Sequence, residues 1–578
     1  MHGKNSFKQS KGFPYHEDVD KLDASASSCA LCAVVKRGVQ SWVDIFWEGV
    51  FPNHLIGRKL SVAKRESGAP GFLVLIDPIN QPVDVVAAIG FFIEAGSIQS
   101  LNRAISWFKD CLETHESCPT NMTLLPTRVL DVSTPGDGIR LIDSVGMLGQ
   151  YACLSYCWGS SKQFTTTRDT IKMRMSGFSE SDLPRTILDA VIIVRHLAIK
   201  YLWVDSLCIC QGDGEDWSRE SARMTEIYSN AHIVIANNHG RDSSIGCFGT
   251  RPPRPMAEVR LPGFASNLVA MASYVPEEFW NDLGGFRNEA LSQRGWALQE
   301  RVLAKRLLHY NTRQMYFECN QGIIGEDGCM RKERYCRLDA SIETWDVLVR
   351  FYRERNLTNL TDKFPAIGGL AKLFEEKLKA QYVAGLWSTH LISGLAWKPF
   401  IELPSICDVY IGPSWSWASY GPGLVNMGEV WNDITKVLEW NVEPKTQNNA
   451  YGEISSAWLR IRGPILNLIP VGFELFTNPP HATFRLHNDA EEQLVRFDSL
   501  PELESENREL LTSNLEVILL QEQANYVGQF HDPYTCFGLV VKKVGNERKR
   551  VGYMHLFERD QVASLIEDES NWKTVTLI

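Results

Sequence analysis

The sequence lacks the segments that direct a protein into or across a membrane. Its first residues are polar and contain no apolar core of a signal peptide. No apolar run reaches about 18 residues, the length that spans a bilayer. The nearest candidate, residues 71–96, is interrupted by Asp77, Pro78, Pro82 and Asp84. We therefore expect a cytoplasmic protein without a transmembrane segment.

Several nucleotide and nucleic-acid signals are also missing. The chain has no GxxxxGK[ST] phosphate loop and no GxGxxG dinucleotide fingerprint, which argues against a P-loop NTPase module and a Rossmann site. It shows no repeat period and no long low-complexity linker. Its 59 Lys and Arg are outnumbered by 69 Asp and Glu, which gives a net charge of −10. A general nucleic-acid binder normally has a basic excess, so we find no strong nucleic-acid signal.

The composition is that of a multi-domain globular protein. The 578 residues exceed what one core usually organises, and 44% of them are apolar against 22% charged. Seventeen Trp supply large side chains for several cores. In a reducing compartment, the 14 Cys are expected to be thiols or metal ligands rather than disulfides.

Four regions differ in pattern. Residues 1–120 combine a polar start with a set of Cys and His, and residues 125–310 alternate between strand and helix patterns. Residues 311–445 are mixed, with helical stretches at TWDVLVRFYRERNL and IGGLAKLFEEKLKAQY. Residues 450–578 hold short strand-like segments, which predict a small C-terminal β domain.

The second region predicts an α/β fold. A strand at residues 151–156 is followed by a helix that starts near Pro184, and then by an apolar strand at residues 201–209. A helix capped by Asp216 leads to a third strand at residues 232–237. This βαβαβ order predicts a mostly parallel sheet flanked by helices.

The same segments resemble a known family. YACLSYCWG, LPRTILDAVIIVRHLAIKYLWVDSLCICQ, EDWSRESARMTEIYSNAHIVIAN and RGWALQERVLAKRLLHY follow the order of motifs in fungal heterokaryon incompatibility (HET) domains. The upstream LPTRVLDV and the downstream PSWSWAS and VGYMHLF fit the same architecture. The resemblance implies a role in fungal non-self recognition and programmed cell death, with a protein partner or self-association. HET domains are distantly similar to TIR domains, some of which cleave NAD, so the resemblance also implies a TIR-like sheet.

A ligand site is expected where the parallel strands end. In open α/β sheets, ligands bind outside the carboxyl ends of the strands. The polar and aromatic residues at those ends are therefore candidates. The RGWALQER motif adds two more: Arg294, which could meet a phosphate, and Trp296, which lies close to it in the sequence. The alternative is that strand ends are polar because they meet turns, and that the arginine belongs to a structural ion-pair network. The candidate ligand-binding residues are Ser155, Tyr156, Trp158, Asp205, Ser206, Asn237, Arg294 and Trp296.

Glu220 is the candidate catalytic residue. It lies on the apolar stripe of its predicted helix, three positions after Trp217 and four before Met224. TIR-type NAD hydrolases use a Glu near a Trp, and a carboxylate can stabilise an oxocarbenium-like ribosyl centre. The spacing in DWSRE is one residue shorter than in that pattern. The alternative is a structural ion pair with Arg219 or Arg223, which leaves the enzymatic role open.

Cysteines of the first region suggest a structural zinc site. Cys29 and Cys32 have CxxC spacing, while Cys111, His115 and Cys118 could lie along one helix face. Four of these five residues would complete a tetrahedral site. The two halves are about 80 residues apart, farther than in the usual zinc motifs, so buried structural thiols are the alternative.

Three functions follow from these observations. The first is a recognition and death-signalling protein that acts through partner binding or assembly. The second is a TIR-like NAD glycohydrolase that uses Glu220. The third is a HET scaffold recruited to an accessory role in a metabolic pathway.

Overall fold

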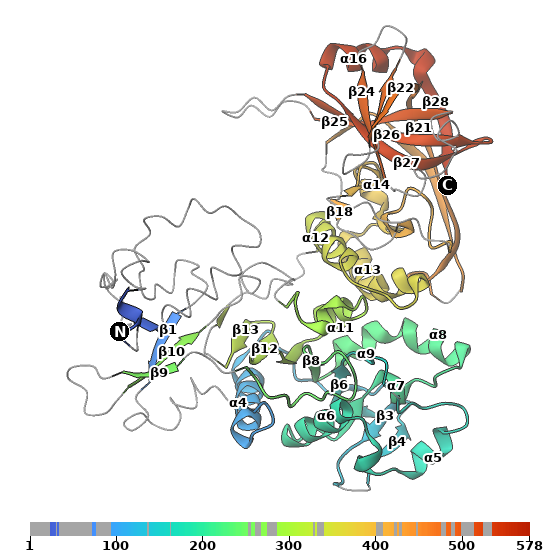
Figure 1. Cartoon of the computed structure of the whole chain (residues 1–578). Helices are drawn as coiled ribbons and strands as arrows, with labels where there is room; N and C mark the ends of the chain where they lie inside the picture. Colours follow the sequence, from blue (N-terminus) through green and yellow to red (C-terminus); the bar gives the residue numbers. More distant parts are fainter. Residues whose placement is uncertain are drawn as a thin grey trace, which may run out of the picture. The chain divides into compact units, whose positions relative to one another are not determined.

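The chain forms two compact units, and each is described by itself (Figure 1). The first consists of Met1–Cys208, Ala231–Leu291 and Lys305–Arg337, and the second of Ile209–Asn230, Ser292–Ala304 and Leu338–Ile578. The predicted region 125–310 therefore contributes to both. The computed structural model describes residues 24–29, 32–33, 72–76, 94–135, 138–161, 163–252, 256–259, 268–273, 286–326, 330–331, 340–399, 409–420, 425–426, 431–446, 449–474, 481–486, 492–498, 514–523 and 534–578.

A nine-stranded sheet organises the first unit. Its strands lie in the order β14-β13-β12-β11-β8-β6-β7-β3-β4. In chain order they are β3 (Arg128–Asp131), β4 (Arg140–Asp143), β6 (Tyr151–Ser155), β7 (Tyr201–Trp203), β8 (Ile233–Asn237), β11 (Arg306–Tyr310), β12 (Met315–Cys319), β13 (Gly322–Gly325) and β14 (Met330–Arg331).

The middle of this sheet is parallel. Strands β7, β6, β8 and β11 are neighbours and run in the same direction. Every residue of β6, β8 and β11 is buried, as expected for strands covered on both faces. The alternation of strands and helices that the sequence predicts is present here, which confirms the α/β class.

The two sides of the sheet are antiparallel. Strand β3 pairs antiparallel with β7 and β4, and β12 pairs antiparallel with β11 and β13. Short connections join β3 to β4, β11 to β12 and β12 to β13, whereas β3 and β7 are far apart in the sequence. The predicted mostly parallel sheet is therefore restricted to the four middle strands, and likeness to TIR domains stays a prediction.

Helices of the first unit follow the predicted order with one correction. Helix α6 begins directly after Pro184, as predicted, and packs against β6 and β7. The segment 201–209, predicted as one strand, is divided: β7 ends at Trp203, and a helical turn begins at Asp205. The Asp205 carboxylate accepts a hydrogen bond from the Ser206 N–H at 2.7 Å and so favours this turn over an extended chain. The helices are α4 (Ile98–Thr114), α5 (Ile171–Ser176), α6 (Arg185–His196) and α7 (Asp205–Cys208).

Two smaller sheets also belong to the first unit. One is three-stranded with the order β1-β10-β9, and the other pairs β2 with β5. Their bounds are β1 (Phe72–Ile76), β9 (Met256–Val259), β10 (Leu268–Ser273), β2 (Thr123–Leu124) and β5 (Leu148–Gly149).

Helices begin the second unit. Helices α12 and α13 confirm the two helical stretches predicted for the third region, and α13 packs against α8, α9 and α11. A Cβ at Gly369 would lie 2.2 Å from the Thr225 Oγ1, so the glycine permits the close approach of α13 to α9. The bounds are α8 (Gly214–Ala222), α9 (Met224–Asn230), α11 (Ala297–Leu303), α12 (Ile342–Arg353), α13 (Pro365–Leu378) and α14 (Leu391–Leu395). Short pairs are formed by β15 (Tyr382–Val383) with β16 (Leu386–Trp387) and by β17 (Lys398–Pro399) with β18 (Val425–Asn426).

A ten-stranded sheet completes the second unit and confirms a β-rich C-terminal part. Its main path is β19-β25-β21-β28-β27-β24-β23-β22, with β20 on β21 and β26 between β25 and β27. Phe484, Val517, Val540 and Met554 are fully buried in its core, and α16 (Arg559–Glu567) adds Val562 to them. The strands are β19 (Asn432–Asp433), β20 (Lys436–Pro444), β21 (Ile454–Asn467), β22 (Ile469–Glu474), β23 (His481–Arg485), β24 (Gln493–Phe497), β25 (Leu515–Gln523), β26 (Thr535–Val544), β27 (Glu547–Leu556) and β28 (Trp572–Leu577).

Membrane-spanning helices are absent from the part of the chain that the structure describes. None of the helices there combines the length and the apolar character that a bilayer crossing requires.

Candidate functional site and candidate metal centre

Polar residues from two neighbouring strands meet at the carboxyl end of the parallel centre. The Tyr156 hydroxyl, just after β6, donates a hydrogen bond to the Ser206 Oγ at 2.9 Å. Both side chains are buried, and so is Ser155, the last residue of β6. The structure therefore brings together three of the residues predicted at the strand ends.

Trp158 and Asp205 form a second pair at this end. The Trp158 indole Nε1 donates to the Asp205 Oδ2 at 2.9 Å, while the other carboxylate oxygen accepts from the Ser206 N–H. The tryptophan and the aspartate are both partly exposed. Asp205 thus links the chain after β6 to the first turn of α7.

Asn237 is the last residue of β8. Its side-chain amide is fully buried and donates to the Gly246 carbonyl at 3.0 Å and to the Thr186 Oγ1 at 3.3 Å. Asn237 therefore ties the strand end to the first turn of α6. The predicted strand-end residues are adjacent as expected, but their polar groups are largely used in contacts with the protein itself.

Asp189 is a buried acid beside this cluster that the sequence analysis missed. It lies on α6, is fully buried, and accepts hydrogen bonds from the Cys247 and Phe248 N–H groups at 2.9 and 3.0 Å. The Arg185 Nε lies 2.9 Å from its other oxygen. Burial raises the pKa of Asp189 despite these contacts. Its position on the apolar face of a strongly amphipathic helix was the signal that could have identified it.

Glu220 lies in the second unit, on α8. The helix is capped by Asp213 rather than by Asp216, and the Asp213 side chain accepts from the Glu215 and Asp216 N–H groups. The Glu220 side chain is only 1% exposed, and the Arg219 Nε lies 3.4 Å from its Oε1. The ion pair weighed as the alternative in the sequence analysis is therefore present.

Arg294 and Trp296 also belong to the second unit. Arg294 forms a parallel bridge with Asn356, and the Gly295 N–H donates to the Asn356 carbonyl at 2.8 Å. The Trp296 indole donates to the Asp362 Oδ2 at 3.1 Å. These contacts connect the start of α11 to the chain after α12, and a role of Arg294 and Trp296 in ligand binding stays a prediction.

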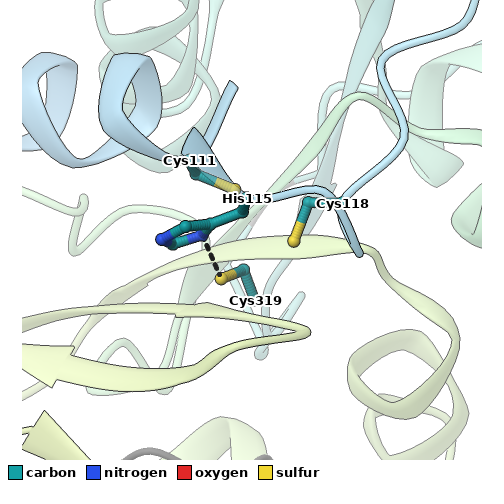
Figure 2. A group of neighbouring side chains, drawn as sticks. All are labelled: Cys111, His115, Cys118 and Cys319. Carbon is teal, nitrogen blue, oxygen red and sulfur yellow. Dashed lines mark hydrogen bonds between the residues drawn. The ribbon is translucent and has the colours of Figure 1, made fainter. Parts of the chain in front are cut away.

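A second cluster in the first unit consists of three cysteines and a histidine (Figure 2). Cys111 lies on the last turn of α4, His115 is the C-cap of that helix, and Cys118 follows in the next turn. Cys319, the last residue of β12, completes the group. One potential ligand atom from each residue lies within 4.8 Å of all the others. The three thiols are free and buried, and His115 is partly exposed.

Local hydrogen bonds hold these residues in place. The Cys118 N–H donates to the His115 carbonyl at 2.9 Å, which turns the chain back after α4. The Gln321 N–H points at the Cys319 sulfur at 3.4 Å, and the Asn320 side chain donates to the Ser117 carbonyl at 2.6 Å. The β12–β13 turn is thus attached to the segment that carries Cys118.

Arg306 lies against the same cluster and is fully buried. Its Nε contacts the Cys111 sulfur at 3.2 Å, and its Nη2 donates to the Cys118 and Pro119 carbonyls at 2.6 and 3.1 Å. Hydrogen bonding among the thiols raises the pKa of Cys111 well above its usual range and lowers that of Cys118 well below it.

The cluster corrects the predicted ligand set. Cys111, His115 and Cys118 are brought together, as predicted, but Cys29 and Cys32 do not belong to this group. Those two lie beside each other instead, since the Cys32 N–H contacts the Cys29 sulfur at 3.5 Å. Cys319 was missed because nothing in the sequence relates it to residues 200 positions earlier. Its place directly before a tight turn was the one local signal.

The fold and these sites define an α/β domain with a parallel centre and a cysteine-histidine cluster at its edge. Residues 151–300 match the family model described as heterokaryon incompatibility protein (HET). The chain therefore contains a HET domain, which confirms the resemblance found in the sequence motifs. The matched segment runs from β6 into α11 and contributes to both units. No curated protein and no solved structure matches the chain.

Proposed function

We propose that this HET-domain protein acts in fungal non-self recognition and triggers programmed cell death by binding a protein partner or by assembly. The match to the HET family over residues 151–300 carries the proposal. The strand ends do not favour turnover, because Tyr156, Ser206 and Asn237 are buried and bonded to other protein groups.

An exposed apolar surface supports partner binding. Leu124 on β2 and Leu148 on β5 are cross-strand neighbours, and they are 60% and 64% exposed. Met122, two residues before Leu124, and Val145, in the turn before β5, are exposed to a similar degree. Leu124 and Leu148 thus form an exposed apolar pair, and exposed apolar patches mark interaction sites. A protein partner with an apolar contact surface would cover them.

The position of Glu220 argues against NAD hydrolysis. A catalytic carboxylate must reach the ribosyl carbon of its substrate, whereas this one is buried and lies beside Arg219. Nothing among the described residues supports NAD as a ligand.

Regulated expression of the full chain in a filamentous fungus tests the proposal. We expect growth arrest and uptake of a vital dye, with cellular NAD unchanged before death begins. Leu124→Glu combined with Leu148→Glu should abolish the arrest without changing the thermal unfolding of the purified protein. Val544→Glu is the matched control, because Val544 is 47% exposed but lies in the C-terminal sheet.

Two outcomes would contradict the proposal, and a third would exclude only the proposed partner surface. Early NAD loss that disappears in Glu220→Gln would make the protein a glycohydrolase. Absence of growth arrest at high expression would favour the accessory metabolic role. Arrest that persists in the double Glu variant would exclude the β2–β5 surface as the partner site.

A further inference from the structure

We infer that Cys111, His115, Cys118 and Cys319 bind one structural zinc ion, which fastens the end of α4 to the β12–β13 hairpin of the first unit (Figure 2). Zinc bonds of about 2.3 Å to sulfur in a tetrahedron place the sulfur atoms about 3.8 Å apart. The four potential ligand atoms lie within 4.8 Å of one another, so small side-chain movements bring them to this geometry.

The donor set points to zinc in a structural role. Three thiolates and one imidazole are a typical closed zinc shell, which leaves no position for a water or a substrate. Soft sulfur ligands also disfavour magnesium and calcium. The thiols are buried, as a site that serves stability rather than exchange requires.

The charge of the site is the second observation that supports a bound zinc ion. Three thiolates and one dication carry a net charge of −1, which the guanidinium of Arg306 would neutralise. Arg306 is fully buried, and among the described residues no carboxylate lies within ion-pair distance of it. Burying an uncompensated cation is costly, so the anionic zinc-thiolate group supplies the missing partner.

Two groups lie beside the ligands in the manner of other zinc sites. The His115 Nδ1 lies 3.3 Å from the Cys319 sulfur and faces the cluster, while its Nε2 lies 3.9 Å from the Asp110 carboxylate. A metal-bound histidine usually has a carboxylate or carbonyl behind its other nitrogen. The Gln321 N–H directed at the Cys319 sulfur would in turn stabilise a thiolate.

The ion would join parts of the chain that are far apart in sequence. His115 and Cys319 are 204 positions apart, and they lie on either side of the segment that matches the HET family. The folded domain would therefore extend beyond residues 151–300, with α4 as a fixed part of it. A cross-link that closes so long a loop is expected to restrict the unfolded chain strongly.

Metal analysis and cobalt substitution of the full chain test the inference. We expect one zinc per chain after purification without added metal. Replacement by Co²⁺ should give the intense visible bands of a tetrahedral site and thiolate-to-cobalt charge-transfer bands in the near ultraviolet. Cys319→Ser should lower zinc affinity at least 100-fold and weaken the charge-transfer bands by about a third, since one of three thiolates is lost.

Two further variants keep the test decisive if Cys319→Ser folds poorly. Cys319→His retains four ligands, so it should keep one metal per chain while its cobalt charge-transfer bands decrease. The double variant Cys29→Ser, Cys32→Ser is the matched control and should leave stoichiometry, affinity and spectrum unchanged.

Results of three kinds would overturn the inference. Less than about one tenth of a zinc per chain, with no cobalt spectrum on addition of Co²⁺, would exclude the site. An unchanged cobalt spectrum in both Cys319 variants would exclude Cys319 as a ligand. Loss of metal in the Cys29 and Cys32 control would assign the ion to the CxxC pair.

Discussion

Each unit of the molecule contains one arginine among its largest completely buried side chains, and these two arginines are balanced differently. In the second unit, the Arg550 guanidinium forms a bidentate pair with Asp498 at 2.6 and 3.1 Å and lies 3.5 Å over the Trp397 ring. In the first unit, Arg306 contacts the Cys111 sulfur and the carbonyls of His232, Cys118 and Pro119. Arg550 thus has a carboxylate partner in the protein, whereas Arg306 faces thiols.

This difference implies that the stability of the two units depends on different conditions. A carboxylate is charged at neutral pH, so the charge of Arg550 is balanced by Asp498 of the protein itself. A cluster of thiols becomes fully anionic only when a metal replaces the protons. The first unit should therefore respond to metal removal, and the second should not.

The largest expected effect is the loss of the carboxylate in the second unit. Asp498→Ala leaves Arg550 buried without its partner, which should destabilise the second unit by about 3–5 kcal/mol. Hydrogen exchange of β26 and β27 under native conditions measures this. The control is Glu439→Gln, which breaks the exposed pair with Arg460 and should cost less than about 1 kcal/mol. Equal effects of the two substitutions would show that burial is not the cause.

Removing the guanidinium of the first unit should have a smaller effect, seen in metal affinity. Arg306→Met should weaken zinc binding about 10- to 100-fold, because residues behind the ligands typically contribute that much. Competition with a chromophoric chelator measures the affinity. Arg306→Lys, which keeps the charge, should recover part of the loss. If Arg306→Met binds zinc as tightly as the native chain, the charge-balance argument is wrong.

Acid should destabilise the first unit through His232. Burial, together with nearby Arg306 and Lys305, lowers the pKa of His232 from 6.5 to about 4. Because the unfolded chain takes up a proton near pH 6.5 and the folded one does not, stability falls as the pH drops from 6.5 to 4. We expect a loss of about 1–2 kcal/mol over this range. His232→Phe should remove this part of the pH dependence of the free energy of unfolding, measured with urea. An unchanged pH dependence in this variant would contradict the prediction.

Asp346 should make the second unit slightly less stable as the pH rises, which is the opposite direction to the effect of His232 in the first unit. Burial and the neighbouring Glu343 raise the pKa of Asp346 from 3.8 to about 7. The folded state therefore holds this proton longer, and stability falls as the pH rises from about 4 to 7. Asp346→Asn should stabilise the second unit by about 1 kcal/mol at pH 8 and leave it unchanged at pH 3.5, since the group is partly exposed. Hydrogen exchange of α12 at the two pH values measures this, and an equal gain at both would contradict it.

Local patterns predicted the elements of the fold better than their pairing. The helix after Pro184 and the strands at residues 151–156 and 232–237 have strong apolar periodicity, and they occur as predicted. The helical turn at Asp205 was missed because one capping carboxylate changed the conformation of an otherwise apolar run. The antiparallel sides of the sheet depend on turns such as that between β12 and β13, for which the sequence carries little signal.

The residues of the candidate sites were likewise predicted only where they are close in the sequence. Cys111, His115 and Cys118 were identified together because their spacing places them near one helix end. Cys319 and Arg306 join them only through the pairing of β11 with β12, a tertiary contact that no local spacing encodes. The burial of Glu220 likewise depends on how the helices of the second unit pack, and DWSRE alone gave no indication of it.

The measurement that tests this account most directly is amide hydrogen exchange of the full chain before and after zinc is removed with a chelator. The account predicts a loss of protection in α4 and in the β12–β13 hairpin, with β26 and β27 around Arg550 unchanged. Restoring zinc should restore the protection. Unchanged exchange in α4 and the hairpin, or an equal loss in both units, would contradict the claim that a metal ion balances the first unit alone.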